Sequence, residues 1–330
     1  MLTADAVAVI LADEEKSSKL HTLLGHARDG RHTVVVDPAN ALDGWLSTID
    51  DASRNQYGIA LQLCAREASL QGRDIATIKI AAGPVATWDD PLAELPFDLT
   101  LDVLAEPLGV LVENAENDFA FILSLMSPSQ RESFLRKIDR RWIEPLHGGG
   151  SDAIARLRAR SDRPAMKLRT YFMFDSDRLH PDECAPTWDG SSPDGRQIEC
   201  QAFRWEPEVM KHLSGRYWRL HRRFIESYMP IDELQAENSN AAEAWGRLSE
   251  EQRWFYNMKD GFAKDRKRHD SARARDLYGD VADEDRAALE QGFGSKLAGR
   301  FQKHANHCFN WDRAALTEAR HQIYQLLRLA

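Results

Sequence analysis

The chain has few cysteines, no long hydrophobic run and no basic leader. Its four cysteines, Cys64, Cys184, Cys200 and Cys308, include no CxxC pair, so we expect free thiols in a reducing cytoplasm and no structural zinc site. The apolar piece AVAVILA at residues 6–12 is too short to cross a membrane. We therefore expect a strand there rather than a signal peptide, and a cytoplasmic protein that has no membrane partner.

Two further motifs are incomplete. The segment GFGSK at residues 292–296 lacks the length and the Lys-Ser/Thr ending of a phosphate loop, so we expect no ATPase within this chain. His304, His307 and Cys308 have helical spacing but no carboxylate or fourth ligand beside them. We expect them to be packing or surface residues rather than metal ligands.

The charge is acidic overall but unevenly distributed. The 330 residues carry a net charge of −9, and residues 1–105 hold 8 Lys and Arg against 16 Asp and Glu. Residues 253–275 instead carry eight basic and three acidic residues with aromatic residues among them. Such a segment can bind a phosphate backbone even on an acidic protein, although a solvated helix face has the same composition. The candidate nucleic-acid contacts in it are Lys264, Arg266, Lys267 and Arg268.

The first 105 residues alternate between strand and helix patterns and predict a small α/β domain. We find no chemical motif in this acidic part, which suggests an assembly or regulatory surface. The expected strands are 6–12, 32–37, 74–83 and 97–104, and the expected helices are 13–27 and 41–68.

A second alternation over residues 106–230 predicts a parallel, Rossmann-like sheet, and residues 231–330 predict a mostly helical extension with the basic segment. Pro128 divides or kinks one helix, and Ser151 or Asp152 caps another. In the last helix, Leu316, Ile323 and Leu327 are predicted to share a face. The expected strands are 108–113, one that begins at residue 142, 167–174 and 197–205, and the expected helices are 118–141, 153–161, 216–230 and 311–329.

Carboxylates follow two of the predicted strands. The run Tyr171–Phe174 has no polar alternation, as in a strand buried on both faces of a parallel sheet, and it leads into Asp175 and Asp177. Ligands bind beyond the carboxyl ends of such strands. Two carboxylates this close repel each other unless a cation or a proton lies between them, and Mg²⁺ prefers such oxygen ligands. Taken alone, the same pattern also fits a solvated turn.

Glu113 ends the predicted strand LGVLVE at residues 108–113 in the same way. Crossover helices between the two strands should place both carboxyl ends at one edge of the sheet. We therefore expect Glu113, Asp175 and Asp177 to form one three-carboxylate site.

The segments VLVENAENDFAFIL, HGGGSD and YFMFDSDRL together resemble the acidic and glycine motifs of the TOPRIM domain, the metal-binding fold of topoisomerases, primases and OLD-type nucleases. The resemblance covers residues 107–230. It implies that Glu113 binds metal or does acid/base work and that Asp175 and Asp177 bind Mg²⁺ or Mn²⁺. The family has a small residue after the first Glu and an acid four positions on, whereas this chain has Asn114, with Glu116 and Asp118 as candidates for the second acid.

The resemblance extends to two segments further along the chain. RYWRLHRRFIESYMP at residues 216–230 resembles the R-x-x-E-x-Y segment of OLD-like defence proteins. It implies that Glu226 completes a second metal site with Arg222 or Arg223 on a phosphate, although Arg222 and Glu226 also suit a helical surface pair. Lys259 in YNMKDGF resembles the lysine that OLD-type nucleases place near the scissile phosphate, and an ordinary surface lysine is the alternative.

These features imply a metal-dependent nuclease that hydrolyses the phosphodiester bonds of DNA, in bacterial defence against phage or foreign DNA. The implied partners are DNA and either a separate ATPase subunit or further copies of the chain. Two alternatives stay open. One is a degenerate TOPRIM subunit that binds DNA without catalysis, and the other is a nucleotide-sugar transferase that uses the Asp pair to hold a metal-diphosphate.

Overall fold

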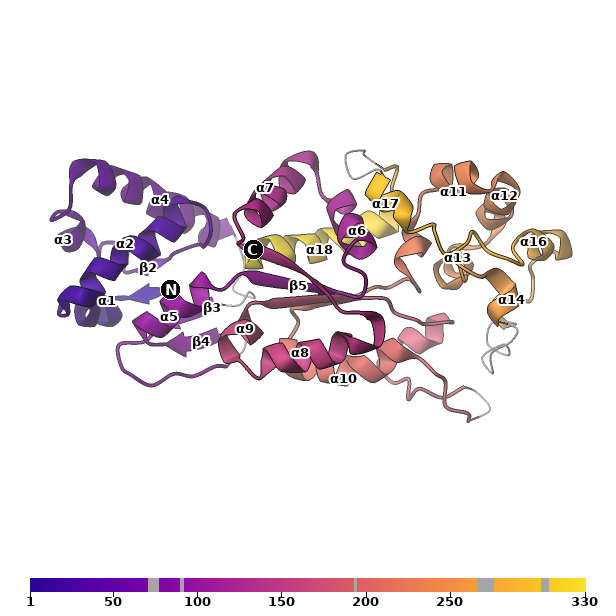
Figure 1. The fold of residues 1–330 in the computed structure, drawn as a ribbon, viewed down its shortest axis with the longest axis horizontal. Coiled ribbons are helices and arrows are strands. Elements are labelled where there is room, and N and C mark those ends of the chain that lie inside the picture. Colours follow the sequence, from indigo (N-terminus) through magenta and orange to yellow (C-terminus); the bar gives the residue numbers. More distant parts are fainter. Residues whose placement is uncertain (71–76, 90–91, 193–194, 266–275, 304–308) are drawn as a thin grey trace.

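The computed structural model describes residues 1–70, 77–89, 92–192, 195–265, 276–303 and 309–330. It contains two parallel four-stranded sheets, each flanked by helices, in an elongated molecule (Figure 1). The predicted α/β class is therefore confirmed. Among the described helices, none combines the length and the hydrophobicity needed to cross a membrane.

The first sheet lies at the N-terminal end of the molecule and has the strand order β2-β1-β3-β4, all parallel. Leu2 of β1 is fully buried among residues of the helices that cover it, such as Ile10 and Leu24. The elements are β1 (Leu2–Thr3), α1 (Ala4–Leu11), α2 (Glu14–Arg28), β2 (Val36–Asp37), α3 (Asp43–Leu46), α4 (Asp51–Leu70), β3 (Thr77–Ile80), β4 (Leu92–Leu95) and α5 (Phe97–Ala105).

Two strand predictions in this part were wrong. Residues 6–12 lie mostly in helix α1, where Thr3 caps the first turn and Ala6, Val7 and Ile10 form the buried face. Residues 97–104 lie in helix α5, which buries Phe97, Thr100 and Val103 at a spacing of three. In both cases a short apolar run has no period that distinguishes a strand from a buried helix.

The second sheet forms the centre of the molecule, with the order β6-β5-β7-β8, all parallel. Every residue of β5 and β7 is buried, as predicted for strands covered on both faces. One face packs against α6 and the C-terminal helices, and the other against α8 and α10. The elements are β5 (Leu108–Val112), α6 (Asn117–Leu125), α7 (Pro128–Asp139), β6 (Ile143–His147), η1 (Gly150–Asp152), α8 (Ala153–Ser161), α9 (Pro164–Leu168), β7 (Thr170–Phe174), η2 (Pro181–Cys184), α10 (Gln201–Leu213) and β8 (Tyr217–Arg219).

The end of this sheet differs from the prediction. The expected strand 197–205 mostly joins helix α10, whose buried Trp205, Val209 and Leu213 recur at helical spacing. The expected helix 216–230 is instead strand β8, followed by a loop and the 3-10 turn η3 (Ile225–Tyr228). The expected helix 118–141 is divided at Pro128. Helix α6 ends at Leu125, and α7 begins at Pro128 with Ser127 as its N-cap.

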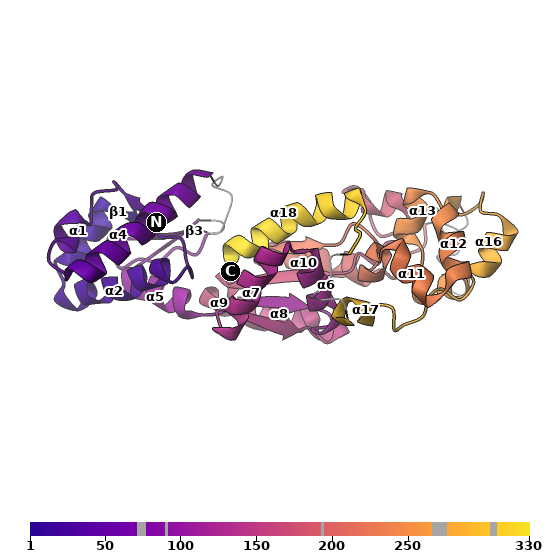
Figure 2. The ribbon, with the colours of Figure 1, turned by 90° about the horizontal axis from the view of Figure 1, so that it is seen from above.

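The C-terminal part is helical, as predicted, and its last helix α18 lies along one face of the central sheet (Figure 2). The predicted face of α18 was partly wrong, because Leu316 is 43 % exposed while Ala315, Ala319 and Ile323 are buried. The described helices are α11 (Ile231–Glu237), α12 (Ser239–Arg247), α13 (Glu250–Phe255), α14 (Gly261–Asp265), α16 (Asp283–Ala288), α17 (Gly299–Lys303) and α18 (Arg313–Leu329).

The order of the central sheet determines where a ligand can enter. From β5 the chain moves to β6 on one side, then returns past β5 to β7 on the other side. The helices α6 and α10 that follow β5 and β7 pack on opposite faces of the sheet, and in sheets of this kind the ligand crevice lies at the carboxyl ends of two such neighbouring strands. Glu113 and Asp175 are the first residues after β5 and β7.

Candidate active site

Glu113 and Asp175 meet at this crevice. The backbone N–H of Asp175 donates a hydrogen bond of 3.2 Å to Oε1 of Glu113. Oδ1 of Asp175 in turn accepts a bond of 3.1 Å from the backbone N–H of Ile225. The structure thus brings the two strand-terminal carboxylates together and ties them to the segment after β8.

The Asp175-Ser176-Asp177 turn is fixed by its own backbone and by the same segment. The N–H of Asp177 donates to the carbonyl of Arg223 at 3.1 Å, and the buried Ser176 hydroxyl donates to the carbonyl of Arg222 at 2.9 Å. Asp177 has a φ of 54°, a left-handed conformation that Asp tolerates better than most residues. This conformation turns the chain sharply just after β7.

The glycine motif lies beside Glu113. The N–H of Gly148 donates to the carbonyl of Val112 at 2.6 Å, and the N–H of Gly149 donates to the carbonyl of Glu113 at 3.2 Å. A Cβ atom at position 148 would lie 2.8 Å from the Val112 oxygen and 2.9 Å from Cβ of Ala153. Glycine is needed here because the loop after β6 packs directly against the end of β5.

The structure separates the two candidates for a second acid. Asp118 is 9 % exposed, and its Oδ2 accepts a hydrogen bond of 2.7 Å from the N–H of Asn114. Glu116 is exposed. Oδ1 of Asn114 accepts bonds from the N–H groups of Glu116 and Asn117, so Asn114 forms the turn that brings Asp118 back to Glu113.

Glu226 also lies at this site, although not on a helix. It is 1 % exposed, and its Oε1 is 3.3 Å from Nζ of Lys259. Its Oε2 is buried and has no hydrogen-bond partner within the part of the chain that the structure describes. The predicted surface pair of Glu226 with Arg222 was therefore wrong, since the partner of Glu226 is a lysine 33 residues away.

Lys259 is held over the carboxylates rather than extended into solvent. Its Nζ lies 4.6 Å from the centre of the Phe224 ring, a cation–π distance. Its backbone N–H donates to Oδ1 of Asn257, and its carbonyl accepts from the N–H of Gly294 at 3.0 Å. The backbone of Lys259 is thus fixed by Asn257 and Gly294, and its ammonium group is positioned by the Phe224 ring.

The pKa values of the site reflect burial and mutual repulsion. Burial, reinforced by the charges of Asp177 and Asp118, raises the pKa of Glu113 to about 8. Burial together with the charge of Glu113 raises the pKa of Asp175 well above its usual range. Burial and the charge of Glu226 raise the pKa of Asp118 to about 6. Burial opposes the charged form of Lys259, but the carboxylates outweigh it, and the pKa of Lys259 is raised.

Arg222 and Arg223 are the residues that were expected to contact a phosphate beside Glu226. Arg222 is buried, and its Nη2 lies 2.7 Å from both carboxylate oxygens of Asp312. Arg223 is 1 % exposed and makes two hydrogen bonds of 2.8 and 2.9 Å to Asp265. The assignment of these arginines to phosphates is corrected, because both guanidinium groups already pair with carboxylates and anchor the loop after β8.

The basic segment is only partly described. Lys264 is exposed and pairs with Asp260 one helical turn away. The candidates Arg266, Lys267 and Arg268 lie outside the described residues, as do His304, His307 and Cys308.

A divalent metal fits the donor chemistry of the site. The available side-chain donors are carboxylate oxygens, which suit Mg²⁺ or Mn²⁺, and Oε2 of Glu226 is a buried acceptor without a hydrogen bond. Within the described part of the chain, however, no three His, Cys, Asp or Glu side chains already have the arrangement of a metal site. A metal ion would therefore have to draw these carboxylates closer together.

Comparisons of the chain with protein-family models, curated proteins and solved structures found no match. The assignment of the site accordingly depends on its own geometry. The sequence analysis did not identify Asp265 and Asp312, which pair with Arg223 and Arg222. Each acid lies far along the chain from its arginine, and no local sequence pattern indicates such a pair. Asn114 could have indicated that Asp118, rather than Glu116, lies at the site. The side chain of Asn often accepts hydrogen bonds from N–H groups shortly after it in the chain and so forms a turn.

Proposed function

We propose that this chain is a metal-dependent phosphodiesterase of the TOPRIM type that cleaves DNA. The observation that carries the proposal is the contact between Glu113 and Asp175 at the topological switch point of a parallel sheet, with Lys259 held above them. Strongly coupled carboxylates in such a crevice favour a catalytic or metal-binding site over a structural one. A role in defence against phage or foreign DNA follows from the resemblance alone.

The residues would take distinct roles. Glu113, Asp175 and Asp177 would hold a divalent metal ion, with Asp118 and Glu226 beside them. When bound, such an ion polarises a phosphate and lowers the pKa of a bound water. Lys259 would neutralise negative charge on the phosphate. The anchored loops at Asp177 and Gly148 would keep the carboxylates in place before substrate binds.

The direct test is incubation of the purified chain with linear, circular and single-stranded DNA and with RNA. Each substrate is offered with Mg²⁺, with Mn²⁺ and with chelator, and the products are separated by electrophoresis. We expect cleavage of DNA that requires the metal and is lost in Asp175→Asn, a variant that keeps the shape of the side chain. The matched control is Asp139→Asn, an exposed acid at the end of α7.

Two observations favour a second function, that of a DNA-binding subunit without catalysis. The described carboxylates are not arranged as a metal site, and Asn114 replaces the small residue of the TOPRIM pattern. Binding of DNA without cleavage under any of these metal conditions would select this function. Nothing in the described ranges of the chain favours the nucleotide-sugar transferase.

A further inference from the structure

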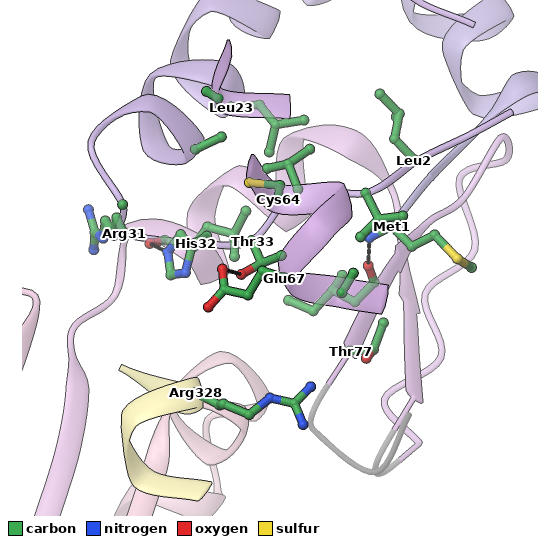
Figure 3. A pocket seen from close by; sticks show the side chains of 18 of the residues that line it. Met1, Leu2, Leu23, Arg31, His32, Thr33, Cys64, Glu67, Thr77 and Arg328 are labelled. Carbon is green, nitrogen blue, oxygen red and sulfur yellow. Dashed lines mark hydrogen bonds between the residues drawn. The ribbon is translucent and has the colours of Figure 1, made fainter. Parts of the chain in front are cut away.

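A cavity of about 1130 Å³ lies between the N-terminal sheet and the central part of the molecule (Figure 3). From the N-terminal side it is lined by Met1, Leu2 and residues 30–37 among others, and from the central side by Lys137, Arg169 and the end of α18. Arg328 extends from α18 toward the N-terminal elements in Figure 3. This cavity is separate from the carboxylate site, because Leu168 and Arg169 in its lining precede β7, whereas Asp175 follows β7.

The charged side chains around the cavity are mostly basic. Arg28, Arg31, Lys137, Arg169 and Arg328 line it, whereas the acidic side chains of the lining are Asp37 and Glu67, beside the C-terminal residue Ala330. In the described part of the chain, Arg31, Lys137 and Arg169 form no ion pair with a carboxylate. Basic side chains therefore outnumber acidic ones in the described lining, and these three basic residues lie there without a carboxylate at ion-pair distance.

Of these basic residues, Arg169 is the one that lies in the interior. It is 7 % exposed, and its Nη1 donates to the carbonyl of Leu329 at 2.6 Å. Its Nη2 is buried and has no hydrogen-bond partner among the described residues, and neither does Nε of Arg31. Unpaired buried donors are rare because each loses its hydration without compensation. Both donors belong to arginines that line this cavity, where a bound acceptor would satisfy them.

Mutual repulsion of these cations is consistent with an anion site. Burial and the charge of Arg31 lower the pKa of Arg169 to about 9. Burial and the charge of Arg169 lower the pKa of Lys137. A bound anion would relieve both effects.

The remaining wall of the cavity is apolar. Leu63 and Leu92 line this space and are 60 % and 49 % exposed, so they offer accessible apolar surface in front of the buried core residues Leu2 and Ile80. Guanidinium groups bind phosphate oxygens with two parallel hydrogen bonds, and an apolar wall suits a flat ring. A ligand-binding cavity is typically about 300 to 1,000 Å³, so the volume is ample for a small molecule.

We propose that this cavity binds a nucleotide, with the phosphates on Arg31, Lys137 and Arg169 and the base against the apolar wall. The site lies at the opposite end of β7 from the carboxylates, since Arg169 precedes the strand and Asp175 follows it. Five strand residues span roughly 16 Å. The proposal is therefore independent of the proposed nuclease activity.

The test is isothermal titration of the full chain with ADP, ATP, pyrophosphate and adenosine in chelator, so that metal-dependent binding at the carboxylates does not contribute. Asp175→Asn is titrated in parallel and should bind the nucleotides as the unmodified chain does. We expect saturable binding of ADP or ATP at one site per chain, and much weaker binding of adenosine.

Three variants locate the binding. Arg169→Gln removes the buried donor and should abolish binding. Thr33→Glu adds a carboxylate at an exposed lining position and should weaken ADP binding by about tenfold, whereas Glu67→Gln removes one and should strengthen it. Thr33→Glu and Glu67→Gln change exposed side chains, so they still test the proposal if Arg169→Gln does not fold.

The matched controls are Glu132→Gln and Arg156→Gln, both exposed and remote from the lining. Absence of nucleotide binding at millimolar concentration would overturn the proposal. Equal affinities in Thr33→Glu, Glu67→Gln and the controls would also overturn it, as would adenosine binding as tightly as ADP.

Discussion

At the residue scale, the sequence predicted one site of Glu113, Asp175 and Asp177, because these acids follow two fully buried strands of one parallel sheet, and the structure brings Glu113 into contact with Asp175. It could not choose between Glu116 and Asp118, since that choice depends on the hydrogen bonds of Asn114 within the turn. It also could not place Glu226 against Lys259, because their contact depends on how two distant loops pack. Local patterns thus identify strand ends, whereas contacts between loops require the fold.

The pKa of Glu113, raised to about 8 by burial and by Asp177 and Asp118, predicts a pH-dependent stability without metal. The folded chain keeps a proton on Glu113 that the unfolded chain releases near its ordinary value of about 4.3. This contribution is present at low pH and is lost as pH rises from about 5 through about 8. In chelator, the urea midpoint should fall over this range, and less so in Glu113→Gln. Parallel curves for both proteins would contradict the raised pKa.

Glu226→Gln tests whether this buried carboxylate takes part in the chemistry. The change keeps the shape of the side chain but removes the charge that holds Lys259 and would help to hold a metal ion. We expect DNA cleavage to fall at least about tenfold, with little change in melting temperature, because loss of the ion pair is offset by reduced repulsion with Asp118 and Asp175. Glu233→Gln, on a partly exposed ion pair with Arg300, is the control. Unchanged cleavage would make Glu226 a purely structural partner of Lys259.

At the scale of elements, the sequence succeeded where periodicity was long or a proline intervened, as at Pro128 and in the two central strands. It failed for short apolar runs such as residues 6–12 and 97–104, where a strand and a buried helix share the same composition. It failed also after α10, where β8 has only three residues and is fixed by pairing with β7 rather than by its own pattern. A short stretch of sequence does not show with which distant strand it will pair.

The loop after β8 depends on its two buried arginines. Asp265 is 4 % exposed and pairs with the buried Arg223, so Asp265→Ala would leave a buried charge without a partner. We expect a loss of about 3 to 5 kcal/mol in the free energy of unfolding. Asp312→Ala should cost less, because the side chain of Asp312 is 51 % exposed and water can replace it at Arg222. Urea unfolding of both variants checks the order, and equal losses would contradict this account.

At the scale of the whole molecule, both sheets have the same relative strand order, in which the first strand lies between the second and the third. The carboxylate site uses the switch point of the central sheet, and the basic cavity lies at the junction with the N-terminal one. The chain as a whole is acidic, so any DNA contact must use a local basic surface. The predicted segment around Lys264 is the candidate for this surface.

Reversing Lys264, Arg266, Lys267 and Arg268 to Glu should weaken DNA binding and flatten its salt dependence. Each phosphate contact contributes about 0.9 to the slope of log affinity against log salt concentration. Fluorescence anisotropy with a labelled duplex at several salt concentrations measures this slope. A slope equal to that of the unmodified chain would show that the segment is only solvated.

The most direct test of the central claim joins cleavage, metal binding and stability in Glu113→Ala, Asp175→Ala and Asp177→Ala. If these carboxylates form one metal site, each change should abolish DNA cleavage and weaken Mn²⁺ binding by calorimetry. The melting temperature in chelator should stay the same or rise, because crowded carboxylates repel each other without metal. A melting temperature lowered by many degrees, with Mn²⁺ binding intact, would instead show that these acids only stabilise the fold, and it would contradict the nuclease assignment.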